Sequence, residues 1–145
     1  MTKSIAQILQ SKGREVFSVT PKATVYEALQ VMADNKVGAL VVLDEGQVVG
    51  IFSERDHVRK VDLDGRCSQK AFVHQVMSED ICYITPEVSV DEAMAIMTDK
   101  RCRHLPVMEN EQLAGLVSIG DLVKASLEEK ELVIKQLKKY IKGDH

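Results

Sequence analysis

The chain has 145 residues, of which 45% are hydrophobic and 28% charged, and its formal net charge is −3. This length suits one compact domain or two small halves packed together. The negative charge argues against the broad basic surface of a nucleic-acid-binding protein. No apolar run approaches the ~18 residues of a membrane span, and the N-terminal apolar segment is too short for a secretory signal. We expect a cytoplasmic protein with no nucleic-acid or membrane partner.

Two features argue against catalysis and against a metal site. The three cysteines, Cys67, Cys82 and Cys102, do not have metal-ligand spacing. No Ser/His/Asp order and no paired carboxylates stand out as a catalytic set. The sequence therefore predicts a protein that is not an enzyme and holds no metal.

The first predicted elements are a helix over residues 4–10 and a short strand over residues 17–19. The strand ends at Thr20-Pro21, because proline cannot continue it. Thr24 and Glu27 then form a capping box, which opens a second helix.

Two further strands are predicted over residues 39–43 and 47–52, joined by a tight turn at Asp44-Glu45-Gly46. Ser53 is placed to cap a helix that runs to Lys60. The Ser-x-x-Asp segment thus lies where a buried strand meets a helix N-terminus.

The whole arrangement repeats at an offset of 65 residues. Residues 17–60 align with 82–125 without a gap, and 14 of 44 positions are identical. Unrelated sequences would share far fewer, so the chain is an internal duplication. We place one copy in residues 1–65 and the other in residues 66–145, each burying a face in a shared core.

Both copies end in Gly-x-x-Ser-x-x-Asp. A capping box would explain Ser-x-x-Asp by itself, but glutamate closes that box better than aspartate, and both copies use aspartate. Each motif also follows a strand end, where ligands commonly bind. A carboxylate there suits the hydroxyls of a ribose, and helix amides with a nearby arginine suit phosphate. The motif residues are Gly50, Ser53, Asp56, Gly115, Ser118 and Asp121.

The ordered pattern of Thr-Pro strand end, capped helix, two strands and Gly-x-x-Ser-x-x-Asp, present twice, resembles tandem CBS domains (a Bateman module). The sequence segments SERD, RHLPV and SIGDLVK are similar to those of stand-alone CBS pairs. The resemblance implies an α/β (α+β) fold of two β-α-β-β-α repeats with pseudo-two-fold symmetry, often as a dimer. It also implies an adenosine ligand such as AMP, ATP or NAD in clefts between the copies, with no required cofactor.

The resemblance assigns roles to individual residues. Asp56 and Asp121 would bind ribose hydroxyls, with Ser53 and Ser118 at the ribose or phosphate. The candidate phosphate partners are Arg55, Arg103 and His104, and the adenine surround is Thr20, Ala39, Leu40, Thr85, Leu105 and Pro106. Because Arg103 and His104 align with Gly38 and Ala39, we expect one cleft lined by charge and the other by small residues.

Residues 119–141 are expected to form a last helix with a coiled-coil-like apolar stripe, interrupted by Lys130. The stripe either packs against a second subunit, giving a homodimer, or folds back on its own domain. The stripe residues are Val123, Leu127, Ile134, Leu137 and Ile141.

Two functions fit these observations. The first is a non-catalytic adenine-nucleotide sensor that signals to a partner protein by a conformational or oligomeric change. The alternative is a protein-interaction scaffold whose nucleotide clefts are vestigial and whose C-terminal helix binds the partner.

Overall fold

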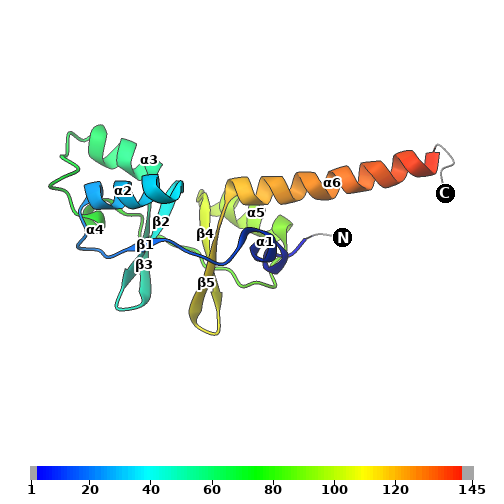
Figure 1. The fold of residues 1–145 in the computed structure, drawn as a ribbon, viewed down its shortest axis with the longest axis horizontal. Helices are drawn as coiled ribbons and strands as arrows, with labels where there is room; N and C mark the ends of the chain where they lie inside the picture. The colour runs from blue at the N-terminus through cyan, green and yellow to red at the C-terminus, as the bar shows by residue number, and fades with distance from the viewer. Residues whose placement is uncertain (1–2, 142–145) are drawn as a thin grey trace. The chain divides into compact units, whose positions relative to one another are not determined.

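The computed structural model describes residues 3–141, and the chain folds as two compact units (Figure 1). The repeat-1 unit consists of Glu15–Ile81. The repeat-2 unit combines Met1–Arg14 with Cys82–His145. Both contain helices and strands, as predicted, and each is described separately below.

The repeat-1 unit is built on a three-stranded sheet in the order β1-β2-β3. β1 (Ser18–Val19) runs parallel to β2 (Ala39–Asp44), and β3 (Gln47–Ser53) pairs antiparallel with β2. The parallel pair needs a crossover, which α2 (Val25–Asn35) supplies. Thr24 and Glu27 form both halves of the predicted capping box at the start of α2.

The helix expected to run from Ser53 to Lys60 has two geometries. One α-helical turn, α3 (Glu54–Asp56), passes into a π-helix, η1 (His57–Asp62). The wider turn places the Leu63 N–H on the Val58 carbonyl, five residues back, at 3.0 Å. Such turns are rare and often lie beside functional sites.

The repeat-2 unit carries an antiparallel hairpin of β4 (His104–Glu109) and β5 (Gln112–Ser118). The strand predicted to precede it is reduced to one parallel bridge between Ile84 and Val107. The β-α-β-β-α order is otherwise kept. The helices of this unit are α1 (Ile5–Lys12), α5 (Val90–Lys100) and α6 (Ile119–Ile141).

The copies predicted in residues 1–65 and 66–145 each begin with a segment that packs in the compact unit of the other copy. α1 precedes the first copy yet packs in the repeat-2 unit, where Ile5 N donates to Val88 O at 2.9 Å. α4 (Val73–Val76) precedes the second copy yet packs in the repeat-1 unit, where Val73 N donates to Ala23 O at 2.8 Å. Each leading helix therefore completes the core of the other copy.

The shared glycine of the two motifs makes room for these exchanged helices. A Cβ on Gly115 would lie 2.7 Å from Leu9 Cδ2, just beyond the middle of α1. A Cβ on Gly50 would lie 2.5 Å from Met77 Sδ, just after α4. Non-bonded atoms do not approach so closely, so a larger residue would force the Leu9 or Met77 side chain, or the segment that carries it, to shift. The glycines have a packing role that the motif by itself does not reveal.

Candidate functional site

The first Ser-x-x-Asp motif forms a corner where β3 ends. The Cα atom of Ser53 is paired with that of Ala39, at the start of β2. Ser53 caps α3, because its Oγ accepts from Asp56 N at 3.3 Å while Asp56 Oδ2 accepts from Ser53 N at 3.0 Å. We call Ala39, Ser53 and Asp56 the Ser53 corner.

Asp56 is the only charged residue that the structure buries among residues 3–141, with 8% of its surface exposed. Two groups outside the cap compensate it. Ser78 Oγ donates to Asp56 Oδ1 at 3.1 Å, and the Lys60 ammonium lies 3.3 Å from the same oxygen. Both carboxylate oxygens thus have protein donors, as a buried charge requires.

The second motif forms the equivalent corner where β5 ends. The Cα atom of Ser118 is paired with that of His104, at the start of β4. Ser118 N donates to Asp121 Oδ2 at 2.8 Å, and Asp121 N donates to Ser118 Oγ at 3.2 Å. His104, Ser118 and Asp121 are the Ser118 corner.

Asp121 has its cationic partner on α1. The Lys12 ammonium lies 2.6 Å from Asp121 Oδ2 and also donates to Leu116 O at 2.7 Å. Burial raises the pKa of Asp121, but hydrogen bonds from Lys12 and Ser118 and the Lys12 charge outweigh it, so the net pKa is lowered. Asp121 is therefore ionised at neutral pH, and 25% of its side chain is exposed.

The expectation that aspartate closes a capping box poorly is wrong for this protein. In both corners the carboxylate accepts from the backbone N–H of the serine three residues back. At Ser53 the extended backbone, with φ −124° and ψ 167°, turns this N–H toward the shorter side chain. The motif therefore has a complete structural role, and any ligand role is additional to it.

The strand registers place the predicted adenine residues at different ends of the sheets. Ala39 and Leu40 begin β2 beside the Ser53 corner, but Val19 is level with Val42, so Thr20 follows at the opposite end of β2. At ~3.3 Å per residue the separation from Ser53 is about 13 Å along the strand. The structure does not bring Thr20 to the Ser53 corner.

Thr85 is displaced in the same way in the repeat-2 unit. Ile84 is bridged to Val107, three residues along β4 from His104, so Thr85 lies beyond the hairpin's middle. A hydrogen bond with the Thr85 hydroxyl, the largest cause, lowers the pKa of Glu87. Thr85 therefore belongs to the turn before α5 and not to the Ser118 corner.

The other predicted residues differ in exposure. Leu40, Leu105 and Pro106 are buried in their strands, so only their backbone could meet a ligand. Arg55 is half-buried in the single turn of α3, His104 is half-buried, and Arg103 is exposed at the loop before β4.

A cleft of about 270 Å³ borders the Ser118 corner between α1 and α6. Three lysines and two acids line it, and Lys3 Nζ bonds Glu128 Oε2 across it at 2.8 Å. Its positive excess suits an anion beside the Asp121 carboxylate. The lining residues are Lys3, Gln7, Ile8, Ser11, Lys12, Asp121, Lys124, Ala125 and Glu128.

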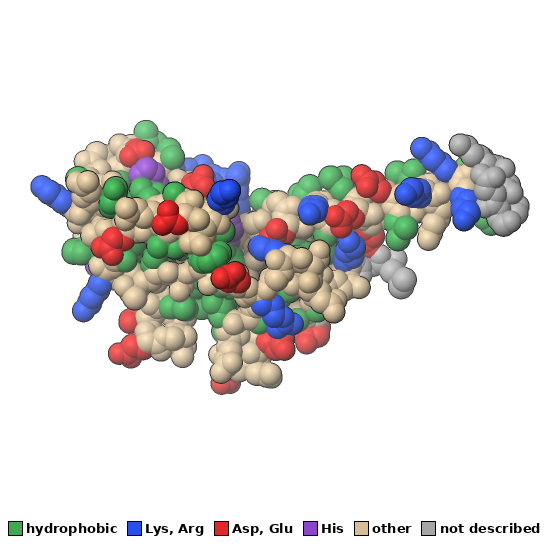
Figure 2. All heavy atoms as spheres, viewed as in Figure 1, with side chains coloured by type: hydrophobic (Ala, Val, Ile, Leu, Met, Phe, Trp, Pro, Cys, Tyr) green, Lys and Arg blue, Asp and Glu red, His purple; other side chains and the backbone are tan. Residues whose placement is uncertain are grey.

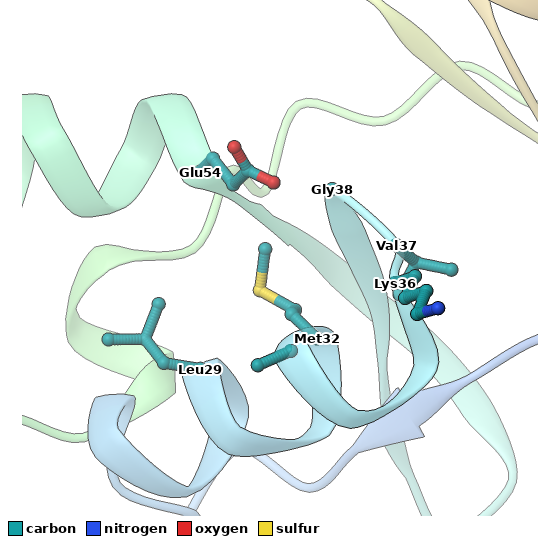
Figure 3. A pocket seen from close by; sticks show the side chains of 7 residues that line it. Leu29, Met32, Lys36, Val37, Gly38 and Glu54 are labelled. Carbon is teal, nitrogen blue, oxygen red and sulfur yellow. The ribbon is translucent and has the colours of Figure 1, made fainter.

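A pocket of about 350 Å³ lies beside the start of α3 in the repeat-1 unit (Figure 3). Figure 3 shows the Met32 side chain reaching toward Glu54, whose carboxylate borders the pocket. Glu54 lies close to Gly38, where a Cβ would be only 3.3 Å from its Oε1. One base (Lys36) and one acid (Glu54) line this pocket beside apolar residues, so it lacks the positive excess of the cleft at the Ser118 corner and suits phosphate less well.

Comparison with known proteins identifies the family. The family model of the CBS domain matches residues 6–59 and again residues 73–128. The chain belongs to the CBS-domain family. It contains two such domains in tandem, and its structural neighbours include stand-alone CBS proteins.

Three relatives show how far this CBS similarity extends. The mitochondrial CBS domain-containing protein CBSX3 of Arabidopsis thaliana is 38% identical, covering 98% of this chain and 73% of its own length. A CBS-domain containing protein from Agrobacterium tumefaciens is 41% identical, with a TM-score of 0.81 over 86% of this chain and 99% of its own. The hexameric CBS-CP12 protein from bloom-forming cyanobacteria is 26% identical, with a TM-score of 0.77 over 85% and 71%.

CBS pairs are generally regulatory modules, and nothing in these relatives indicates a catalytic role for the present pair. No helix within residues 3–141 is both long and apolar enough to cross a membrane.

Sequence reasoning missed three residues of this CBS pair that contact the aspartates: Lys12, Lys60 and Ser78. Lys60 could have been found, because it stands four residues after Asp56 on the same helix. Lys12 and Ser78 could not be assigned from spacing, because they lie at the ends of the leading segments that the two units exchange.

Proposed function

We propose that this CBS pair is a non-catalytic regulatory module that binds an adenine nucleotide and signals to a partner protein by a conformational or oligomeric change. The ligand class is AMP, ATP or NAD. One observation carries the proposal: an ionised Asp121 at a helix N-terminus borders a cleft lined by Lys3, Lys12 and Lys124.

The chemistry of the Ser118 corner suits the two ends of a nucleotide. Ribose hydroxyls can donate to the Asp121 carboxylate in place of the Lys12 ammonium. The displaced lysine then joins Lys3 and Lys124 in attracting phosphate. Arg103 and His104 are further phosphate partners in this proposal.

The Ser53 corner is the weaker site of the two. Asp56 is more buried than Asp121, and both of its oxygens already accept from Ser53, Ser78 or Lys60. A ribose must break these bonds, and the half-buried Ser53 and Ser78 regain little water in exchange, which costs free energy. We therefore propose that nucleotide binds first at the Ser118 corner.

Titration calorimetry with AMP, ATP and NAD tests the proposal. At least one should bind the wild type, and Asp121→Ala should weaken it about tenfold or more, since a bond to a charged group contributes about 1.5–3 kcal/mol. Asp91→Ala removes a carboxylate on the exposed face of α5 and should leave the affinity unchanged. No heat and no thermal shift at millimolar nucleotide would refute nucleotide binding.

Two comparisons separate the ribose contact from the phosphate contact. The 2′,3′-dideoxy analogue should bind the wild type more weakly than the parent nucleotide, and Asp121→Ala should bind both equally weakly. Lys12→Met should weaken AMP more than adenosine, because only AMP carries the charge that Lys12 meets. Equal losses for AMP and adenosine would remove Lys12 from the phosphate site.

Self-association is part of the proposal, as a homodimer or a larger homo-oligomer. It is supported by the hexameric state of the cyanobacterial CBS-CP12 protein and by the exposed apolar side chains of α6. The same exposure favours the second candidate function, an interaction scaffold with vestigial clefts. Deleting the residues after Lys130 distinguishes the two functions. Loss of partner binding or of the dimer, with nucleotide binding intact, would favour the scaffold.

A further inference from the structure

Within residues 3–141, the distal half of α6 is not buried against the rest of its own unit. α6 buries only Leu122 and Ala125, both near its start, and every residue from Lys130 to Ile141 is exposed. Figure 1 shows this segment (orange to red) continuing beyond α1 and α5. A twelve-residue exposed helix is marginal in water by its own propensity. The segment does not fold back on the described part of its unit, so its apolar side chains are open to a partner outside the unit.

Apolar side chains concentrate on one face of this distal segment. At about 100° per residue, they span little more than a third of the helix circumference. Leu137 lies near the centre of this face, with 57% of its surface exposed. Leu132 is equally exposed, at 58%, but points roughly 140° away. The members of this distal face are Val133, Ile134, Leu137, Tyr140 and Ile141.

Charge along α6 changes from mixed to basic: Lys124 and Lys130 lie among the acidic residues of its first part, and the charged residues of the helix after Glu131 are all lysines. Acidic residues precede the middle of the exposed segment, and lysines dominate after it. Figure 2 shows the lysines gathered near the distal end, with the acidic side chains closer to the rest of the unit. A parallel pair of such helices would place like charges together, whereas an antiparallel pair places acid against base. The residues are Glu128, Glu129 and Glu131, then Lys135, Lys138 and Lys139.

We propose that the distal face of α6 pairs antiparallel with the same face of a second copy of this chain. This gives the self-association proposed above its surface, and it does not depend on nucleotide. We assign the partner as a second copy because each helix carries both the acidic and the basic residues of the pairing. In a two-fold symmetric antiparallel pair, the acidic part of one helix faces the basic part of the other, and the symmetry repeats the contact.

The spacing sets the register of the pair. If the two helices cross midway between Ile134 and Leu137, Ile134 of one copy faces Leu137 of the second copy, and the reverse. Glu131 and Lys138 are seven residues apart and so flank this seam on the same side. The crossing brings Glu131 within one turn of Lys138 of the second copy, and the symmetry repeats the contact. Lys130 lies at the seam, where its methylene stem can cover apolar surface while its ammonium stays in water.

Sedimentation equilibrium of the full chain at about 10–100 micromolar tests the face. The wild type should dimerise, and Leu137→Asp should raise the dissociation constant about tenfold or more. Leu132→Asp is the matched control, equal in exposure and chemistry but on the opposite side, and should leave it unchanged. Circular dichroism checks that both variants keep the helix.

Charge exchange tests the antiparallel register. Glu131→Lys and Lys138→Glu should each raise the dissociation constant at least about threefold, and the double variant should recover wild-type dimerisation. Glu131 and Lys138 do not touch within one helix, but both lie within one turn of Lys135, so circular dichroism must show equal helicity in the three variants before recovery is assigned to the pair. Recovery cannot arise in a parallel pair, where these two positions do not meet.

Several results would overturn the proposal. The first is a wild type that is still monomeric at about 100 micromolar. The second is equal weakening of the dimer by Leu132→Asp and Leu137→Asp. The third is a double charge variant that does not recover dimerisation. A monomer that pellets with anionic phosphatidylglycerol vesicles would assign the face to a lipid surface instead. AMP titration of Leu137→Asp is run in parallel. Normal AMP binding by a monomer would leave the nucleotide proposal intact, and absent AMP binding by a wild-type dimer would leave the pairing intact.

Discussion

The Ser53 and Ser118 corners have the same strand-to-helix turn and the same closed capping box, but they compensate their carboxylates by different routes. Asp56 takes its cation from Lys60 on its own helix. In the second copy Ala125 stands at the position of Lys60, and Lys12 of α1 replaces it from far along the chain. Duplication preserved the local turn and the need for a cation, and left the source of that cation free to change.

The helices that leave the two corners differ even more. After Asp56 the helix widens into η1 and ends, whereas after Asp121 it continues as regular α-helix to Ile141. The first corner thus has a short helix and a nearly buried carboxylate, and the second carries a long exposed helix. This contrast predicts that the first corner contributes more to stability and the second more to binding.

The largest expected effect comes from the glycines that admit the exchanged helices. Gly50→Val and Gly115→Val should each lower the free energy of unfolding by about 3 kcal/mol, because the new side chain overlaps Met77 or Leu9. Urea denaturation measures this. Gly120→Ala is the control: its Cβ would meet only Ser118 Oγ, at 3.6 Å, so α6 should be unaffected or slightly stabilised. Wild-type stability in both valine variants would mean that the leading helices are loosely packed.

The two aspartates should differ in stability. Asp56→Ala should cost about 2 kcal/mol, since it removes a buried acceptor from the half-buried Ser53 and Ser78 and from Lys60. Asp121→Ala should cost about 1 kcal/mol, because its surroundings are more open to water. Thermal and urea unfolding give both values. A larger cost at Asp121 would reverse the comparison between the corners.

The smallest effect tests the Lys12 contact through pH. The folded-state pKa of Asp121 is lowered, so its stabilisation is present above the unfolded pKa and lost as pH falls through the folded pKa. Lys12→Met raises this pKa, so it should cost about 0.5–1 kcal/mol at pH near 7. The difference from wild type should shrink as the solution is acidified below about pH 4.

Urea unfolding at a series of pH values gives this dependence. Lys22→Met, an exposed lysine before α2, is the control and should be neutral at every pH. A Lys12→Met deficit that does not change with pH would show that packing of the lysine stem, and not its charge on Asp121, produces the effect.

Much of this protein is determined by its sequence because the deciding interactions are local. The capping boxes at Thr24, Ser53 and Ser118 join residues three apart, and the helix and strand periods are set within a few residues. Because the two copies align without a gap, the elements predicted for the first copy apply directly to the second. The element order, the two corners and the family were therefore predictable.

The tertiary structure decided the contacts between segments distant in sequence. In the folded protein, α1 packs in the repeat-2 unit and α4 in the repeat-1 unit. Lys12 contacts Asp121, and Ser78 contacts Asp56. Thr20 and Thr85 lie away from the corners. These outcomes depend on which apolar faces pack together and on strand register. Neither has a local signature, because many pairings bury similar apolar area and only the packed core selects one.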